Sequence, residues 1–223
     1  MPDLGPLWLS LALAGVTTVI LLVIGTPLAW WLAGTSSRWK PAIEAVTALP
    51  LVLPPTVLGF YFLIVLGPAS PVGEFWVRIT GEALTFSFSG LVVASVVYSL
   101  PFMVQPLQNA FESVGRAPLE AAATLRATSI DAFFSVAVPL SKRGFVSAAV
   151  LSFAHTIGEF GVVLMVGGNI PGKTKMISIA IYEHVETLNY TEAHILSAGL
   201  LLFAFVALFS LYAFRRGSPA YVR

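Results

Sequence analysis

Two ionisable residues, His155 and Glu159, stand inside an otherwise apolar stretch of the sequence. They are four residues apart, so a helix would place them on one face. An ionisable side chain inside a membrane-spanning helix indicates a functional position by default. Three interpretations stay open: a local pair or a contact between helices, the lining of a substrate path, and a metal site or proton relay. Two groups alone underfill a zinc site, which disfavours the last.

Hydroxyls and glycines surround this pair. The hydroxyls would offer hydrogen bonds to a passing solute, and the two glycines allow close helix contact or a local bend. Lining of a path or a gate is therefore one function of this stretch. The candidates are Ser152, Thr156, Gly158, Glu159, Phe160 and Gly161.

The proline pair Pro54 and Pro55 forms a second group of candidates. Prolines remove backbone donors and bend a helix. In lipid such a break is tolerated only beside protein or a water-filled cavity. Either this is a packing kink near the start of a helix, or it is a bend that lines a path or opens a gate.

A third group lies in a charged loop between apolar stretches. Pro118 suits the first turn of a helix, and the helix dipole favours Glu120 there. We expect one short helix over residues 118–127 and a second, capped at residue 128 or 129, through residue 134. Pro139 is expected to end regular structure. Two short capped helices suit docking of a partner outside the membrane, and the alternative is an interfacial loop that covers helix ends.

Long apolar segments must position these groups. Of the 223 residues, 57% are hydrophobic and 10% are charged, where a soluble domain has about 25% charged residues. A helix needs roughly 20 apolar residues to cross the hydrocarbon core. The segments are apolar all round, which excludes the alternating strands of a barrel. We therefore expect an all-α membrane protein with about five spanning helices, at residues 7–33, 45–66, 86–108, 144–166 and 195–214.

The basic residues are unevenly divided between the two ends of these helices. The positive-inside rule then places the N-terminus outside and the C-terminus in the cytoplasm. The start, Met1-Pro2-Asp3, lacks the basic residues of a cleavable signal peptide, so the first apolar segment is expected to stay as a helix. The inner side would hold Arg38, Lys40, Arg116, Arg126, Lys142, Arg143, Arg215, Arg216 and Arg223, and the outer side Arg78, Lys173 and Lys175.

Two outer segments connect the spans. Residues 67–82 contain prolines and a glycine and are expected to be a loop. Residues 167–172 carry a strong turn signal. After it, apolar residues recur at helical spacing, which predicts a short amphipathic helix on the outer surface. Its apolar positions are Ile177, Ile181, Val185 and Leu188.

Several function classes are excluded by what the sequence lacks. It has no P-loop, no GxSxG, no HExxH and no glycine-rich dinucleotide turn, so it has no visible means of hydrolysing ATP. The absence of cysteine rules out disulfides and thiolate ligands. A net charge of +1 argues against a nucleic-acid partner. We expect no catalytic residue, no metal and no cofactor in this chain.

The cytoplasmic loop resembles the EAA loop of ABC importer permeases. The pattern is Glu-Ala-Ala, three residues, Gly, nine residues, a branched apolar residue, one residue, Leu-Pro. Val138 stands here where the family has leucine, and Arg126 stands where it has glycine. The change at Arg126 affects the geometry of the local turn but not the alignment of the rest of the pattern. The resemblance implies that this loop forms coupling helices seated in a cleft of an ATPase subunit. The implied coupling residues are Glu120, Ala121, Ala122, Arg126, Ala127, Val136 and Pro139.

Further motifs resemble the molybdate permease subunits: residues 50–55, 157–161 and 168–175. The resemblance covers about residues 8–214, and tungstate and sulfate permeases are close relatives. It implies one permease domain over residues 1–223, with the coupling loop at about 112–143, in a type I importer of the bacterial cytoplasmic membrane.

The implied importer contains two copies of the permease, two ATPase subunits that bind ATP and Mg²⁺, and an external molybdate-binding protein. Transport would follow alternating access, driven by ATP. No Lys or Arg lies within the expected spans, so an oxyanion would meet hydroxyls such as those of Ser152 and Thr156. The alternatives are an ion-coupled secondary transporter, with His155 and Glu159 as its relay, and an intramembrane enzyme. The first disagrees with the lack of an internal repeat, and the second lacks a recognisable nucleophile.

Overall fold

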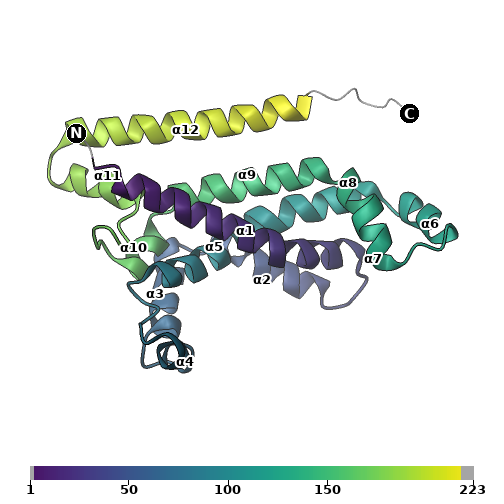
Figure 1. The fold of residues 1–223 in the computed structure, drawn as a ribbon, viewed down its shortest axis with the longest axis horizontal. Helices are drawn as coiled ribbons and strands as arrows, with labels where there is room; N and C mark the ends of the chain where they lie inside the picture. The colour runs from purple at the N-terminus through teal and green to yellow at the C-terminus, as the bar shows by residue number, and fades with distance from the viewer. Residues whose placement is uncertain (1–2, 217–223) are drawn as a thin grey trace.

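Four long helices run side by side along the long axis of the molecule (Figure 1). The computed structural model describes residues 3–216, with side chains described as far as Ala213, and within that range all regular structure is helical. Helix α5 packs against both α1 and α9, and it is therefore the centre of the bundle. The long helices are α1 (Gly5–Gly34), α5 (Phe88–Val114), α9 (Lys142–Gly158) and α12 (Tyr190–Arg216).

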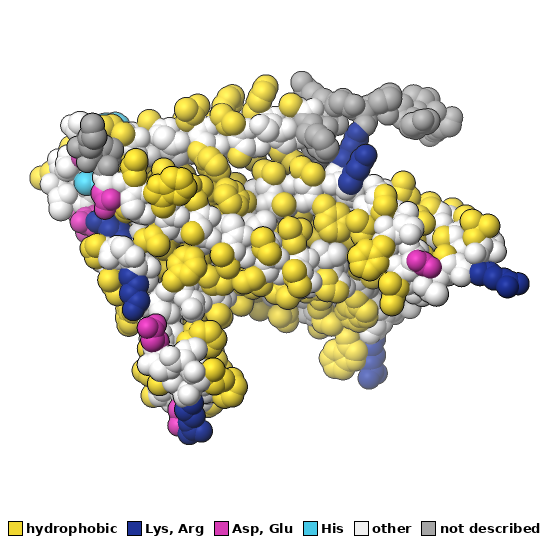
Figure 2. All heavy atoms as spheres, viewed as in Figure 1, with side chains coloured by type: hydrophobic (Ala, Val, Ile, Leu, Met, Phe, Trp, Pro, Cys, Tyr) yellow, Lys and Arg dark blue, Asp and Glu magenta, His cyan; other side chains and the backbone are white. Residues whose placement is uncertain are grey.

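Three helices of the described part, α1, α5 and α12, are long and apolar enough to cross a membrane. The number rises to as many as five if each of two bent helix pairs counts as one span. Apolar side chains cover the middle of the bundle and charged side chains gather towards its ends, as Figure 2 shows. Such a broad exposed apolar surface is typical of a surface that meets lipid.

The second expected span is bent where the prolines predict it. Helix α2 (Lys40–Val52) and helix α3 (Pro55–Leu66) meet at an angle of 110°. Pro54 has no N–H to continue the ladder, and Leu53 closes the last turn of α2 by donating to the carbonyl of Leu49 at 3.0 Å. The expected bend is confirmed, and it turns α3 away from the bundle (Figure 1).

The fourth expected span, residues 144–166, is not one helix. Helix α9 ends at Gly158, and helix α10 (Gly161–Gly167) begins after two residues that are not helical. Glu159 is extended, with φ −65° and ψ 131°. The expectation that His155 and Glu159 share one helix face is therefore wrong, because the helix ends between them.

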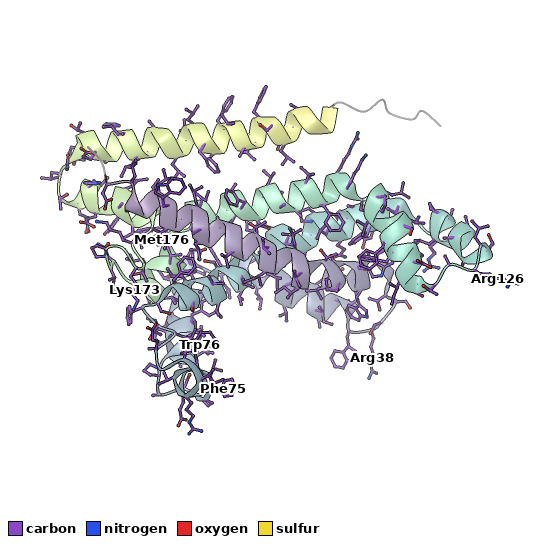
Figure 3. All side chains as sticks on the ribbon, viewed as in Figure 1. Arg38, Phe75, Trp76, Arg126, Lys173 and Met176 are labelled. Carbon is purple, nitrogen blue, oxygen red and sulfur yellow. The ribbon has the colours of Figure 1, made fainter. Side chains whose placement is uncertain are left out.

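The outer segment 67–82 contains a helix that we expected to be a loop, α4 (Pro71–Thr80). Ser70 caps it, since its Oγ accepts a hydrogen bond from the amide of Gly73 at 2.9 Å. Proline follows at the first helical position, and Gly81 ends the helix with φ 76°. Phe75 and Trp76 lie on this helix at the far end of the α3–α4 arm (Figure 3). Ser70, Pro71 and Gly81 are helix start and stop signals in the sequence. The expectation of a loop rested instead on the proline and glycine content of the segment.

The amphipathic outer helix is present as α11 (Ile177–Glu186). Ile177 is buried and Ile181 packs against the same cluster, so the apolar side meets the bundle. Leu188 lies beyond the end of α11, with φ 60°, and is exposed. Of the basic residues assigned to the inner side, Arg223 lies outside the described residues, and the side chains of Arg215 and Arg216 are not described.

The contact between α5 and α9 depends on a glycine. A Cβ added at Gly144 would lie 2.2 Å from the Cβ of Ala110. Neither atom belongs to a flexible side chain, so Gly144→Ala must push the two helices apart. We expect a loss of about 1–3 kcal/mol in stability, seen as a lower midpoint of thermal unfolding in detergent. The control is Gly15→Ala in α1, where nothing lies within 4 Å of the added Cβ. Equal midpoints for the two variants would contradict this account.

Candidate functional site

The two helix breaks lie against each other. A Cβ added at Gly161 would lie 2.7 Å from the Cβ of Pro55, and one added at Gly59 would lie 2.6 Å from the Cβ of Met165. Only glycine permits so close an approach between α3 and α10. Pro54 is exposed beside this contact and Pro55 is half-buried. The structure thus brings the proline candidates and the glycine candidates together, although about 100 residues separate them.

Glu159 fills the space between three helices. Its side chain is 4% exposed, and its Oε2 accepts a hydrogen bond from Ser95 Oγ of α5 at 2.9 Å. Its backbone carbonyl accepts a hydrogen bond from Ser178 Oγ of α11 at 2.6 Å. Its Oε1 has no hydrogen-bond partner within the described residues. Phe160 turns to the outer helix and packs on Tyr182, with ring centroids 5.0 Å apart.

His155 contacts α5 one turn away from that site. Its Nδ1 lies 2.9 Å from Ser99 Oγ, which is also 2.9 Å from Thr156 Oγ1. Its ring stacks on Phe102, with centroids 3.9 Å apart. No hydrogen bond joins His155 to Glu159 in the part of the chain that the structure describes. Both residues make contacts between helices, which is one of the three interpretations of this pair.

A cavity of about 560 Å³ lies between α5, the end of α2 and the start of α9. Ser152 and Thr156 do not line it. They are 0% and 2% exposed, and Thr156 Oγ1 donates to the carbonyl of Ser152 at 2.9 Å. The polar lining consists of residues that the sequence analysis did not propose for the path or the gate: Gln105, Asn109, Ser113, Ser141, Arg143 and Ser147.

One signal for this lining was visible in the sequence. Gln105, Asn109 and Ser113 recur every four residues, the spacing of one helix face. Arg143 was missed for another reason. It precedes the expected start of its span at residue 144, whereas α9 begins at Lys142 and holds Arg143 in its first turn.

The loop between α5 and α9 is folded into short helical pieces that project from one end of the bundle (Figure 1). They are α6 (Ala117–Thr124), α7 (Ser129–Ala132), the π-helical turn η1 (Phe133–Ala137) and α8 (Val138–Leu140). Glu120 lies in the first turn of α6 and is exposed. Thr128 caps α7 as expected, because its Oγ1 accepts from the amide of Asp131 at 3.2 Å. The two expected short helices are therefore present.

Pro139 does not end regular structure. It lies in α8, which follows the π-helical turn η1 without a break. The helical path continues and bends by 72° between residues 129–140 and α9. The expected end of the loop at Pro139 is thus wrong, and the proline marks a change of direction instead.

Aromatic rings fix this loop to the long helices. The ring of Trp30 in α1 packs edge-on against Phe111 of α5, at 5.1 Å, and against Phe133 of η1, at 5.2 Å. Phe111 also packs edge-on against Phe145 of α9, at 5.8 Å. One cluster therefore joins the loop to three helices.

The tip of the loop is apolar and exposed. Leu125 is 84% exposed, and Ile130 and Phe134 are also exposed. Ala121 is exposed between them, whereas Ala122 is buried and Ala127 and Val136 are half-buried. Small buried residues thus hold the short helices together, and large apolar side chains face outward. Such a surface is typical of a docking site for another protein.

Arg126 occupies a backbone conformation that favours glycine. Its φ is 62°, and the amide of Ala127 closes the turn by donating to the carbonyl of Ala122 at 3.1 Å. The left-handed conformation explains why the EAA pattern has glycine at this position. Arg126 lies at the outermost point of the loop (Figure 3).

The opposite end of the bundle carries an ion pair. Lys175 Nζ lies 2.7 Å from Glu183 Oε2, which also accepts a hydrogen bond from the side-chain Nδ2 of Asn169 at 2.8 Å. These two hydrogen bonds hold the pKa of Glu183 below its usual value. Lys173 lies at this same end and Arg126 at the other (Figure 3). The structure therefore separates the projecting loop from the Lys175–Glu183 ion pair by the length of the bundle.

The family described as "Binding-protein-dependent transport system inner membrane component" matches residues 25–217. The chain is 60% identical to the molybdenum transport system permease protein ModB of Azotobacter vinelandii over 214 residues, 96% of this chain and 95% of that protein. It is 35% identical to the protein of the same name in Escherichia coli K12, over 83% of this chain and 81% of that one.

Solved structures of ABC importers share the fold. A chain of the inward-facing MetNI methionine ABC transporter matches with a TM-score of 0.73 and 18% identity, over 95% of this chain and 93% of that chain. A chain of a bacterial ABC transporter that imports alginate matches with a TM-score of 0.76 and 17% identity, over 97% and 80%.

The conformation of Arg126 leads to a prediction for the loop. Arg126→Gly removes the Cβ that disfavours the left-handed conformation, a gain of up to about 1 kcal/mol, and Arg126→Val adds strain. We expect the first to keep or raise, and the second to lower, the hydrogen-exchange protection of amides at residues 125–127. The matched control is Arg116→Gly, at φ −86°, where no gain is expected. If Arg126→Gly lowers the hydrogen-exchange protection of its neighbouring amides as much as Arg116→Gly lowers that of the amides beside residue 116, then residue 126 is not in the left-handed conformation.

Proposed function

The chain belongs to the family of binding-protein-dependent transport system inner membrane components, multi-pass proteins of the inner membrane, and we propose that it is the permease subunit of an ATP-driven molybdate importer. The observation that carries the proposal is the 60% identity, over nearly the whole chain, to a molybdenum transport permease. Tungstate and sulfate are tetrahedral oxyanions of the same charge, so permeases for these ions are the alternatives.

The proposed partners follow from the projecting loop. Helices α6 and α7 would bind in a cleft of a cytoplasmic ATPase dimer, which binds ATP and Mg²⁺. Glu120, Ala121 and Ala122 lie in α6. The exposed apolar tip of the loop supports this assignment. A second copy of the permease and an external binding protein would complete the importer, and this chain would hold no cofactor of its own.

The proposed orientation has the N-terminus outside and the C-terminus in the cytoplasm. Basic residues mark the cytoplasmic side of a membrane protein. Arg38 and Arg126 lie at one end of the bundle, the end from which the coupling loop projects, which supports this orientation (Figure 3). The loop would then face the compartment that holds ATP.

The proposed mechanism is alternating access. ATP would close the ATPase dimer and displace the coupling loop, and the aromatic cluster around Phe133 would pass the displacement to α1, α5 and α9. The regular helical hydrogen bonding is interrupted at Pro54 and at Gly158–Gly161, so the helices can change direction there most easily, and we assign the gate to these breaks. A ligand moves such an equilibrium only through its different affinity for the two states.

ATPase activity of the reconstituted complex tests the function. We expect molybdate-loaded binding protein to stimulate hydrolysis, relative to the empty binding protein. Tungstate-loaded and sulfate-loaded binding proteins give the substrate range: stimulation by the sulfate-loaded form alone would assign the chain to a sulfate permease. A lack of stimulation by every loaded form would overturn the proposal.

Glu159 gives a second test. Glu159→Gln keeps the volume and the acceptor for Ser95 but removes the ionisable group, so the complex should assemble. We expect the rate of uptake to fall about fivefold, which corresponds to about 1 kcal/mol in the limiting barrier. Ser95→Ala, which keeps the acid and removes the hydrogen bond, is the comparison. If transport-coupled ATPase activity is unchanged in Glu159→Gln, then the acid has no part in the gate.

A further inference from the structure

The cavity beside the start of α9 has a polar wall on α5. Gln105, Asn109 and Ser113 form this wall, one above the other. The side chains of Gln105 and Asn109 are exposed and make no hydrogen bond within residues 3–216. An amide without partners costs free energy in hydrocarbon. This face of α5 therefore meets water or another polar surface rather than lipid.

The opposite wall carries a cation without a counter-charge. Arg143 lies in the first turn of α9 and is half-buried. Among the described residues no carboxylate lies within 4 Å of it, whereas Lys40 pairs with Glu44 and Glu112. The first turn of α9 also contains no acidic residue, although a helix N-terminus favours negative charge. The guanidinium and the N-terminus of α9 therefore contribute positive charge on the same wall of the cavity.

Two buried hydroxyls accompany this cation. Ser141 lines the cavity at the N-cap of α9, is 2% exposed, and its Oγ has no hydrogen-bond partner in the described part of the chain. Ser147 lines the cavity one helical turn after Arg143 and is 3% exposed. A buried hydroxyl without a partner is uncommon in folded proteins and indicates a missing ligand or water.

We propose that this cavity is a tetrahedral-oxyanion site at the cytoplasmic end of the transport path. Arg143 is its cation, and its other donors are the side-chain amides of Gln105 and Asn109 and the hydroxyls of Ser141 and Ser147. The identification of the natural anion as molybdate rests on the proposed function. Guanidinium groups match oxyanions by paired hydrogen bonds. The volume of about 560 Å³ exceeds that of one such ion, so the anion would keep part of its water and bind weakly. Weak binding suits a place from which the ion must leave.

Equilibrium dialysis of radioactive molybdate tests the site. The sample is the detergent-purified complex of this chain with its ATPase subunit, without nucleotide and without binding protein. We expect Arg143→Gln to weaken binding about tenfold or more, as loss of a charged hydrogen-bond donor does. Arg143→Lys should keep part of the affinity. The control is Arg38→Gln, the same loss of charge at the same end of the bundle but outside the cavity, which should bind as the wild type does. Sulfate should compete, and chloride at equal ionic strength should not.

Equal binding by the wild type and Arg143→Gln, in complexes that both assemble, would overturn the proposal. Competition by chloride equal to that by sulfate would also overturn it, since the field would then be unspecific. A phospholipid headgroup offers the same phosphate chemistry. Nanodiscs with and without phosphatidylglycerol separate the two sources. Loss of molybdate binding when this lipid is added would assign the cavity to the headgroup and contradict a site for the free ion.

The same variants separate this site from the proposed function. Uptake by Arg143→Gln in proteoliposomes should be slower than that of the wild type at saturating loaded binding protein. If wild-type ATPase activity responds to loaded binding protein while Arg143→Gln changes neither binding nor uptake, then the importer stands and the site fails. If the wild type does not respond but Arg143-dependent binding persists, then the site stands and the assigned transport fails.

Discussion

A helix that is broken inside a membrane must satisfy its freed backbone groups within the protein, and the architecture of this chain follows from that constraint. Two spans are broken, and the breaks are placed against each other, with Gly161 on Pro55. The carbonyl exposed at Glu159 accepts from Ser178, and the carbonyl of Gly167 accepts from Thr174 Oγ1. The backbone on both sides of α10 is thus bonded within the protein, as irregular backbone at membrane depth requires.

Helix α5 joins the parts that a transport cycle needs. One face of it holds the hydroxyls of Ser95 and Ser99, which bond to the region of the second break. Another face carries Gln105 and Asn109 and lines the cavity. Its C-terminal end carries Phe111, in the aromatic cluster that holds the loop between α5 and α9. One helix therefore connects the loop, the cavity and the second break.

The charges are distributed so that an anion would meet positive potential late in its path. Glu159 is enclosed by three helices and is not presented to the cavity. Arg143 lies without a counter-charge near the proposed cytoplasmic end. Selectivity would then belong to the external binding protein, and the permease would supply a conduit with one weak site before release.

Local sequence determined much of this protein. Apolar length alone places α1, α5 and α12, because the transfer of side chains into lipid is a sum over neighbouring residues. The cap at Thr128 and the dipole preference of Glu120 predict the short helices of the loop, and Pro54 predicts the bend between α2 and α3. Tertiary structure decided what depends on residues far apart in the chain. Three features each need two or three packed helices. They are the close approach of Gly161 to Pro55, the burial of Glu159 between α5 and α11, and the cavity that the polar wall of α5 forms with Arg143. No local pattern contains such a contact, because its energy depends on which faces the packed helices turn towards one another.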